Sequence, residues 1–126
     1  MRSDAFRAAA ERKDFSAVDE LFSEDVAFRS PVVFKPYEGR EALRMILGAV
    51  VEVFEDFRYV EQVEHETTAF LLFKARVGSR EVEGVDVLSF AADGRIRELT
   101  VMVRPMSGIH ALAEAMRAKL EAAGAA

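Results

Sequence analysis

The chain has 126 residues and a mass of 14.0 kDa, with 51% hydrophobic and 31% charged residues. This length and composition predict one globular domain over residues 1–126, large enough to form a core without disulfides or a structural metal. The absence of cysteine excludes thiolate nucleophiles and cysteine-ligated metal centres, and a net charge of −5 without a basic block argues against nucleic acid as a partner.

The first 54 residues have mainly helical patterns. Apolar residues recur at helical spacing in three segments, at Phe6, Ala9 and Ala10, at Phe15, Val18, Leu21 and Phe22, and at Leu43, Ile46, Leu47, Val50 and Phe54. We predict a hairpin of two short helices, the first capped by Ser3, and a longer third helix. Between the second and third helices, Val26 to Ser30 alternates like a short strand that Pro31 ends, and residues 32–39 form a loop.

From residue 57 to residue 104 the pattern is that of an antiparallel sheet. Four strands are predicted, at residues 57–66, 69–77, 81–90 and 96–104, and Asp93-Gly94 is the hairpin turn between the last two. Pro105 ends the last strand, and Ser107 is the expected cap of a final helix. Helices that precede an antiparallel sheet indicate an α+β fold. A curved sheet wrapped around the long third helix would enclose a conical interior.

Several segments carry a family resemblance that spans almost the whole chain. They are Lys13-Asp14-Phe15, Phe22-Ser23-Glu24-Asp25-Val26, Tyr37-Glu38-Gly39-Arg40-Glu41-Ala42-Leu43, and Val85-Asp86-Val87-Leu88-Ser89-Phe90 followed by Asp93-Gly94-Arg95-Ile96. In this order and spacing they resemble the NTF2-like superfamily, in its SnoaL-like or ketosteroid-isomerase-like branch. The resemblance implies a cone-shaped α+β fold with an apolar pocket, and commonly a dimer. It does not imply one reaction, since this fold carries isomerases, hydrolases, cyclases, dehydratases and binding domains.

The resemblance covers the catalytic positions of these enzymes only in part. Ketosteroid isomerases have a base aspartate before the proline that ends the first strand, and Ser30 stands there in this chain. Their oxyanion tyrosine on the first helix corresponds to Phe6, whereas their oxyanion aspartate matches Asp86. The similar limonene-epoxide hydrolases have an arginine where this chain has Gly84. We therefore do not expect steroid isomerisation or epoxide hydrolysis by those mechanisms.

Asp86 is also conspicuous without the family. The other residues on its face of the predicted strand are apolar, namely Val82, Gly84, Leu88 and Phe90. A lone carboxyl in such a row either stays neutral with a raised pKa or finds a specific donor, and both situations recur in active sites. We predict that Asp86 points into the cone and titrates well above an ordinary aspartate. The alternative is a structural acid paired with Arg76 or Arg104, or a position in solvent.

His65 is the second catalytic candidate, because a histidine among carboxylates such as Glu64 and Glu66 can act as a general base. Its face of the strand is mixed and could equally be solvated. The candidate ligand-binding residues are Phe28, Ser30, Tyr37, Leu47, Phe54, Phe73, Leu88, Phe90 and Arg104. Several of these could equally be ordinary core, turn or surface residues. The two histidines fit no metal-ligand spacing, so no metal and no cofactor are expected.

Two functions fit these patterns. The first is a pocket protein for a small apolar molecule, acting as an isomerase, cyclase or hydratase with Asp86 as the proton-transfer or oxyanion-stabilising acid. The alternative is a non-catalytic hydrophobic-ligand-binding or dimerisation module, which the residues Ser30 and Phe6 favour. The pattern does not decide whether a reaction is catalysed.

Partners and location follow from the remaining patterns. Four residues facing away from the cone suggest a homodimer through the sheet: Val85, Val87, Thr100 and Met102. No apolar run reaches the length of a membrane span, and Arg2, Asp4 and Arg7 leave no signal-peptide pattern. We therefore predict a cytoplasmic protein with neither membrane nor nucleic acid as a partner, and the many arginines and alanines suggest a bacterial source.

Overall fold

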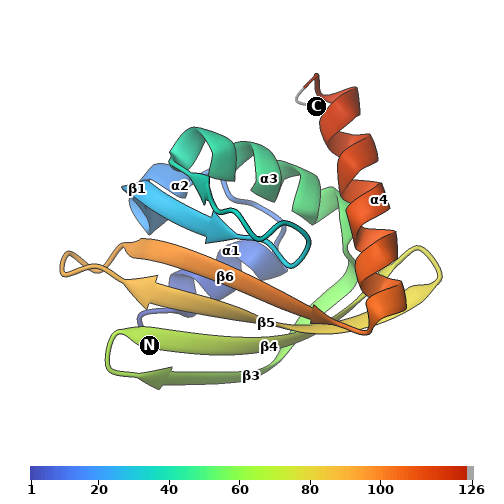
Figure 1. The fold of residues 1–126 in the computed structure, drawn as a ribbon. Helices are drawn as coiled ribbons and strands as arrows, with labels where there is room; N and C mark the ends of the chain where they lie inside the picture. Colours follow the sequence, from blue (N-terminus) through green and yellow to red (C-terminus); the bar gives the residue numbers. More distant parts are fainter. Residues whose placement is uncertain (125–126) are drawn as a thin grey trace.

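The computed structural model describes residues 1–124, which form helices packed on one six-stranded sheet (Figure 1). The helices are α1 (Asp4–Glu11), α2 (Val18–Leu21), α3 (Arg40–Val53) and α4 (Met106–Ala122). The strands are β1 (Phe22–Arg29), β2 (Tyr37–Glu38), β3 (Glu55–His65), β4 (Thr68–Val77), β5 (Arg80–Phe90) and β6 (Ile96–Arg104). Within residues 1–124, no helix has both the length and the apolarity needed to cross a membrane.

The sheet has the strand order β2-β1-β6-β5-β4-β3. Strands β3 to β6 form the predicted antiparallel meander, and the α+β fold class is confirmed. Strand β1, however, pairs with β6 in parallel, so that Phe28 lies beside Leu99. The parallel pair joins two segments about 70 residues apart in the sequence, and local hydrophobic alternation carries no information on such a pairing.

The helix and strand boundaries differ from the predicted ones mostly before residue 40. Strand β1 begins at Phe22, which the helical spacing had assigned to the second helix, and α2 is a single turn. The predicted loop contains the two-residue strand β2. Ser107 lies inside α4, and Pro105 occupies the N-cap position. Ser3 does precede α1, but its hydroxyl donates to Glu64 Oε1 at 2.6 Å and does not cap the helix.

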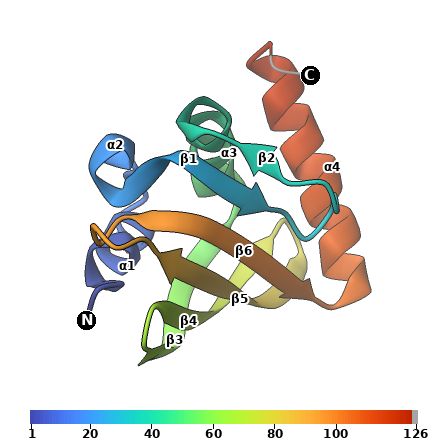
Figure 2. The ribbon, with the colours of Figure 1, turned by 60° about the vertical axis from the view of Figure 1, so that its left-hand side comes forward.

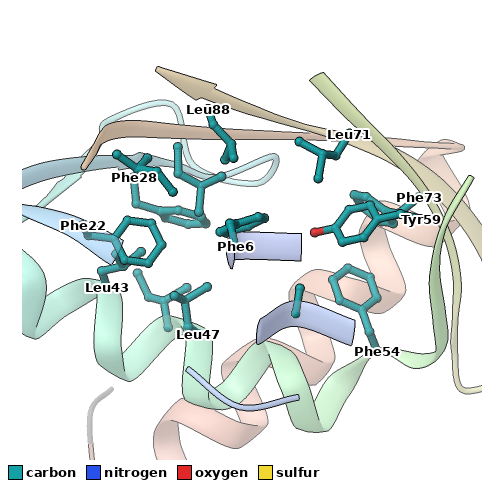
Figure 3. Close-up of a cluster of buried hydrophobic side chains, with 14 of the residues drawn as sticks. Phe6, Phe22, Phe28, Leu43, Leu47, Phe54, Tyr59, Leu71, Phe73 and Leu88 are labelled. Carbon is teal, nitrogen blue, oxygen red and sulfur yellow. The ribbon is translucent and has the colours of Figure 1, made fainter. Parts of the chain in front are cut away.

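Helices α1 and α3 lie on the concave side of the sheet, and α4 stands at one end of it (Figures 1 and 2). Helix α3 turns its apolar stripe towards the sheet, burying Leu43, Ile46 and Leu47. This stripe and inward side chains of the strands, including Leu71 and Leu88, belong to one buried hydrophobic cluster (Figure 3). Removing this apolar surface from water is the main stabilising contribution to such a fold.

Candidate functional site

The concave side of the sheet borders a cavity of about 980 Å³. Its walls come from α1, α3, α4, the inner face of the sheet and the loop between β1 and β2, which Figure 2 shows on the side of the molecule where α4 stands. Apolar side chains that line it include Phe6, Phe15, Phe28, Ile46, Leu47, Val50, Phe54, Phe57, Phe73, Leu99, Val101, Leu112 and Met116. A cavity of this size and composition has the character of a small-molecule site.

Two polar side chains, Tyr59 and Asp86, meet within this apolar wall. The Tyr59 hydroxyl donates a hydrogen bond to Asp86 Oδ2 at 2.6 Å, and each residue is only 6% exposed. Figure 3 shows the hydroxyl oxygen of Tyr59 directed towards the centre of the apolar cluster. A short hydrogen bond between a phenol and a carboxyl in apolar surroundings is a strong interaction with a fixed geometry.

The local structure of two strands brings this pair together. Alternation along β5 turns Asp86 inward with Leu88, as the sequence predicts. On β3 the register shifts between Tyr59 and Glu61, which is a β-bulge centred on Val60. Before the bulge Tyr59 faces inward, and after it Gln62 becomes the inward residue. Bulges often reorient side chains next to functional sites, and this one places Tyr59 opposite Asp86.

Burial controls the protonation of both groups. Loss of hydration raises the pKa of Asp86 to about 7, and the hydrogen bond from Tyr59 opposes this rise. The pKa of Tyr59 lies well above its ordinary value because the ring is buried and the Asp86 carboxylate is adjacent. The raised pKa of Asp86 agrees with the prediction. The carboxyl also has a specific donor, the Tyr59 hydroxyl, which stabilises its charged form.

Gly84 explains why no arginine stands beside Asp86. A Cβ atom at this position would lie 2.3 Å from Cζ of Phe73 and 2.6 Å from the Met102 carbonyl oxygen. The Phe73 ring therefore occupies the space that a side chain at residue 84 would need. The hydrogen-bond donor to Asp86 comes from β3 instead.

Six of the predicted ligand-binding residues line the cavity together with Asp86: Phe28, Ser30, Tyr37, Leu47, Phe54 and Phe73. Ser30 accepts hydrogen bonds from the backbone amides of Val32 and Val33, which fixes the start of the loop at the mouth. Tyr37 lies 6.3 Å from Phe28, measured between ring centroids. Leu88 and Phe90 are buried in the hydrophobic core and are not among the cavity-lining residues within 1–124.

His65 and Arg104 lie away from the cavity. His65 is the last residue of β3, with its side chain 80% exposed and Nε2 3.8 Å from Glu66 Oε1. Arg104 is exposed and paired with Glu83, its neighbour across the sheet. Arg104 follows the alternation of β6 onto the outer face and therefore cannot pair with the inward Asp86. His65 reaches the outer face because the register of β3 shifts after Tyr59.

Tyr59 is the site residue that the sequence reasoning missed. Unbroken alternation puts all odd residues of that strand on one side, so it predicts Tyr59 on the same mixed face as Val63 and His65. The bulge moves Val63 and His65 to the opposite face. A tyrosine among apolar residues was the available signal, since a buried tyrosine hydroxyl usually finds a partner.

Charged side chains lie at the mouth of the cavity. They are Lys13 at the end of α1 and His110, Glu114, Arg117 and Glu121 along α4. Cations and anions alternate here, so the rim has no strong preference for one sign of charge. The described residues contain no group of three or more His, Asp or Glu side chains arranged to hold a metal ion.

Comparison with known proteins assigns the family. Residues 4–99 match the model of the SnoaL-like domain. A steroid delta-isomerase from Pseudomonas aeruginosa is 42% identical, with a TM-score of 0.94 over 99% of this chain and 93% of that one. A protein from Silicibacter pomeroyi, described as conserved in bacteria with a cystatin-like fold, is 30% identical, with a TM-score of 0.91 over 95% and 85% of the two chains.

More distant structures share the fold. An NTF2-like protein of unknown function from Mesorhizobium loti has 21% identity and a TM-score of 0.73, covering 82% of this chain and 88% of that one. No curated protein matches the chain significantly. The family model, which covers most of the chain, and the two closely similar structures agree with the observed fold. The chain therefore belongs to the SnoaL-like family and has the NTF2-like fold.

Proposed function

We propose that the chain binds a small apolar molecule carrying a carbonyl or hydroxyl oxygen, and that Asp86 acts on this oxygen as an acid. The observation that carries the proposal is the 2.6 Å hydrogen bond between Tyr59 and Asp86 inside an apolar cavity. Tyr59 occupies Oδ2, which leaves Oδ1 of Asp86 free to face a ligand. The apolar wall supplies shape and desolvation, and the pair supplies the polar contact that orients the ligand.

The acid can work in two related ways. A neutral Asp86 donates a hydrogen bond, or its proton, to a ligand carbonyl whose oxygen gains negative charge in an enolisation. Tyr59 stabilises the carboxylate that remains when the proton has moved. Both steps belong to isomerase, cyclase or hydratase chemistry, and the name of the Pseudomonas aeruginosa relative, a steroid delta-isomerase, supports the first of these classes.

The position of Ser30 favours the alternative, a non-catalytic hydrophobic-ligand-binding module. The resemblance places a base aspartate at this position in ketosteroid isomerases, and Ser30 instead accepts hydrogen bonds from the amides of its own loop. Enolisation needs a proton acceptor as well as an acid. Without a base at the Ser30 position, the cavity would bind a carbonyl compound without turning it over.

The primary test uses 4-nitrophenol as a probe of the Asp86 contact. We expect saturable binding to the wild-type protein, followed by its absorbance, and at least tenfold weaker binding to Asp86→Asn. Asp25→Asn is the matched control, because Asp25 is an exposed aspartate on β1. Equal affinity of the wild type and Asp86→Asn, or no saturable binding, would contradict the proposal.

A second experiment separates catalysis from binding. Apolar ketones of steroid and terpenoid type are incubated with the protein in D₂O, and the exchange of hydrogen next to the carbonyl is followed by NMR. Exchange that depends on Asp86 supports the enzyme. Saturable thermal stabilisation by the same ketones without exchange supports the binding module, whereas stabilisation only by sugars or nucleotides would refute both.

We also propose that two copies of the chain associate through the outer face of the sheet. Leu72, Val85 and Met102 are neighbours across β4, β5 and β6, and Phe70 lies beside Val87 in the next row. Phe70, Leu72 and Met102 are exposed in the single chain. An isologous dimer would bury this band against its own copy.

A cytoplasmic location and a bacterial source also stay predictions.

A further inference from the structure

Arg7 connects helix α1 to the Tyr59–Asp86 pair. Its guanidinium carbon lies 5.7 Å from the centroid of the Tyr59 ring, which is within the range of a cation–π contact. Its Nη1 donates to Gln62 Oε1 at 2.9 Å, and its Nε lies 3.4 Å from Glu11 Oε2. The Arg7 side chain is only one-third exposed, so water screens its charge less than it screens a free surface arginine.

Further hydrogen bonds fix the position of Arg7. Gln62 Nε2 donates to Ser3 Oγ at 2.7 Å and to Asp4 Oδ1 at 2.9 Å. The amide and the hydroxyl of Ser3 both donate to Glu64 Oε1, at 2.7 Å and 2.6 Å. The β3 bulge turns Gln62 and Glu64 to the side of the sheet that α1 covers. The start of α1 is therefore tied to β3, and the guanidinium is held beside Tyr59.

We propose that Arg7 is a positioning residue for the site: it holds the Tyr59 ring and polarises its hydroxyl, which strengthens the hydrogen bond that Tyr59 donates to Asp86. Negative charge that develops on Asp86 after proton transfer is then shared along the line Asp86–Tyr59–Arg7. The proposal rests on the proposed function for its meaning in catalysis. Its physical content, the coupling between Arg7 and Asp86, can be measured without any ligand.

The surroundings of Asp86 allow its titration to report this coupling between Arg7 and Asp86. Tyr59 is the one ionisable group in direct contact with it among the described residues. Its partners across β4 and β6 are the apolar residues Leu71 and Val101. On α1, Arg7 acts to lower the pKa of Tyr59 and Glu11 acts to raise it, so the Arg7 charge makes the Tyr59 hydroxyl a stronger donor. Removal of the Arg7 charge should therefore weaken the donor and shift the Asp86 titration upward.

The experiment is a carbon-detected NMR titration of the Asp86 carboxyl carbon in wild type, Arg7→Met, Arg7→Gln and Arg7→Lys. Loss of the Arg7 charge should raise the Asp86 pKa by at most about 0.7 units, the value reached if the whole cation–π contact of about 1 kcal/mol depends on the Asp86 charge. We expect this rise in Arg7→Met and also in Arg7→Gln, which keeps a polar group but loses the charge. Arg7→Lys should stay closer to the wild-type value. Arg44→Met, which removes an arginine paired with Asp19, is the matched control and should leave the titration unchanged.

A purely structural role of Arg7 predicts a different outcome. The variants would then lose thermal stability, whereas the Asp86 pKa would stay within 0.1 unit of the wild-type value in all of them, and that result would overturn the proposal. If Arg7→Met and Arg7→Gln do not fold, the Arg7 Nε–H resonance of the wild type is followed instead. It should titrate with the Asp86 midpoint and lose this step in Asp86→Asn; its absence in the wild type would refute the coupling. Failure of 4-nitrophenol to bind would refute the proposed function and leave the coupling intact.

Discussion

Asp86 is a buried acid whose ionisation opposes folding. In the unfolded chain the carboxyl ionises near its ordinary pKa of 3.8, whereas in the folded protein burial raises the pKa to about 7. Between these two values the folded state binds more protons than the unfolded state, so this residue makes stability fall as the pH rises from about 4 to about 7. At pH 8 the difference between the two pKa values lowers the free energy of unfolding by about 4 kcal/mol. A buried carboxyl that lowers the stability of the folded protein in this way is typical of functional sites.

Asp86→Asn should remove this cost. We predict that the variant is more stable than the wild type, and that the difference in their free energies of unfolding grows by about 2–3 kcal/mol from pH 5 to pH 8, because an amide does not ionise. Urea unfolding of both proteins at the two pH values measures the change, with Asp25→Asn as the exposed control. A stability difference between wild type and Asp86→Asn that does not vary with pH would show that Asp86 titrates normally.

Tyr59→Phe isolates the hydrogen bond to Asp86. The Tyr59 hydroxyl lowers the Asp86 pKa, so its removal should raise that pKa further, by about 0.7 unit for a bond worth about 1 kcal/mol. The carboxyl carbon of Asp86 reports the shift by NMR. Tyr37→Phe is the matched control, since Tyr37 lies at the cavity mouth and makes no hydrogen bond to Asp86. An unchanged or lowered pKa in Tyr59→Phe would mean that the hydroxyl does not donate to the carboxylate.

The sequence could predict one member of this pair and not the other. Asp86 follows from simple alternation, because its strand keeps a regular register with β4 on one side. Tyr59 depends on a bulge that involves one extra residue, and no local pattern around Val60 marks it. The same shift explains why the prediction placed Tyr59 and His65 on one face, whereas the structure separates them.

At the scale of elements, the contact between β4 and β5 shapes the wall next to the acid. Phe73 and Gly84 are opposite one another in the sheet, and the Phe73 ring lies over the glycine. The ring also stacks at 4.9 Å on Phe57 and lies 6.4 Å from Tyr59, between centroids. Gly84 therefore allows an aromatic cluster that fixes the Tyr59 ring.

Gly84→Ala should be destabilising. The new Cβ would overlap the Phe73 ring and the Met102 carbonyl, and overpacking of this kind costs about 1–3 kcal/mol. Gly48→Ala is the matched control: Gly48 is exposed on α3 with open space around it, so alanine should stabilise the helix by about 0.5–1 kcal/mol. Chemical denaturation compares the two variants. A neutral or stabilising effect of Gly84→Ala would contradict the close contact.

The helices and strands that can be predicted from the sequence are those that local residue patterns determine. The four-strand meander and α3 follow from residue periodicity and turn chemistry, and the structure has them within a few residues of the predicted limits. Asp93 accepts a hydrogen bond from the Arg95 amide and Gly94 has a φ of 90°, as its turn requires. The pairing of β1 with β6 and the short strand β2 depend on distant segments. Tertiary contacts, which periodicity does not encode, determine both.

At the scale of the whole molecule, the sheet separates two apolar surfaces. Its concave face carries the cavity and the acid, and its outer face carries the exposed band that includes Phe70, Leu72 and Met102. Neither α1 nor α3 covers the outer face, because both lie on the concave side (Figure 1). Contiguous exposed apolar surface on a small protein usually marks an interface. The resemblance to the NTF2-like superfamily implies an apolar pocket and commonly a dimer, and we propose that the outer face of the sheet forms the dimer contact.

Association through the outer face can be tested by sedimentation. We predict a dimer of about twice 14.0 kDa at micromolar concentration for the wild type. Leu72→Glu should produce monomers, because it places a charge within the apolar band. Met45→Glu, at an exposed position of α3, is the control and should remain dimeric. A wild-type protein that sediments as a monomer at this concentration would contradict the interface.

Burial makes Asp86 a weak acid in the cavity, and the hydrogen bond from Tyr59 orients its carboxyl and limits the rise of its pKa. The most direct measurement is the NMR titration of the Asp86 carboxyl carbon in the wild-type protein without ligand. The structure predicts a single midpoint near a pKa of about 7, which a bound 4-nitrophenol shifts because it contacts the same group. A midpoint near the ordinary aspartate value of about 4, unaffected by the probe, would contradict both the environment and the role assigned to Asp86.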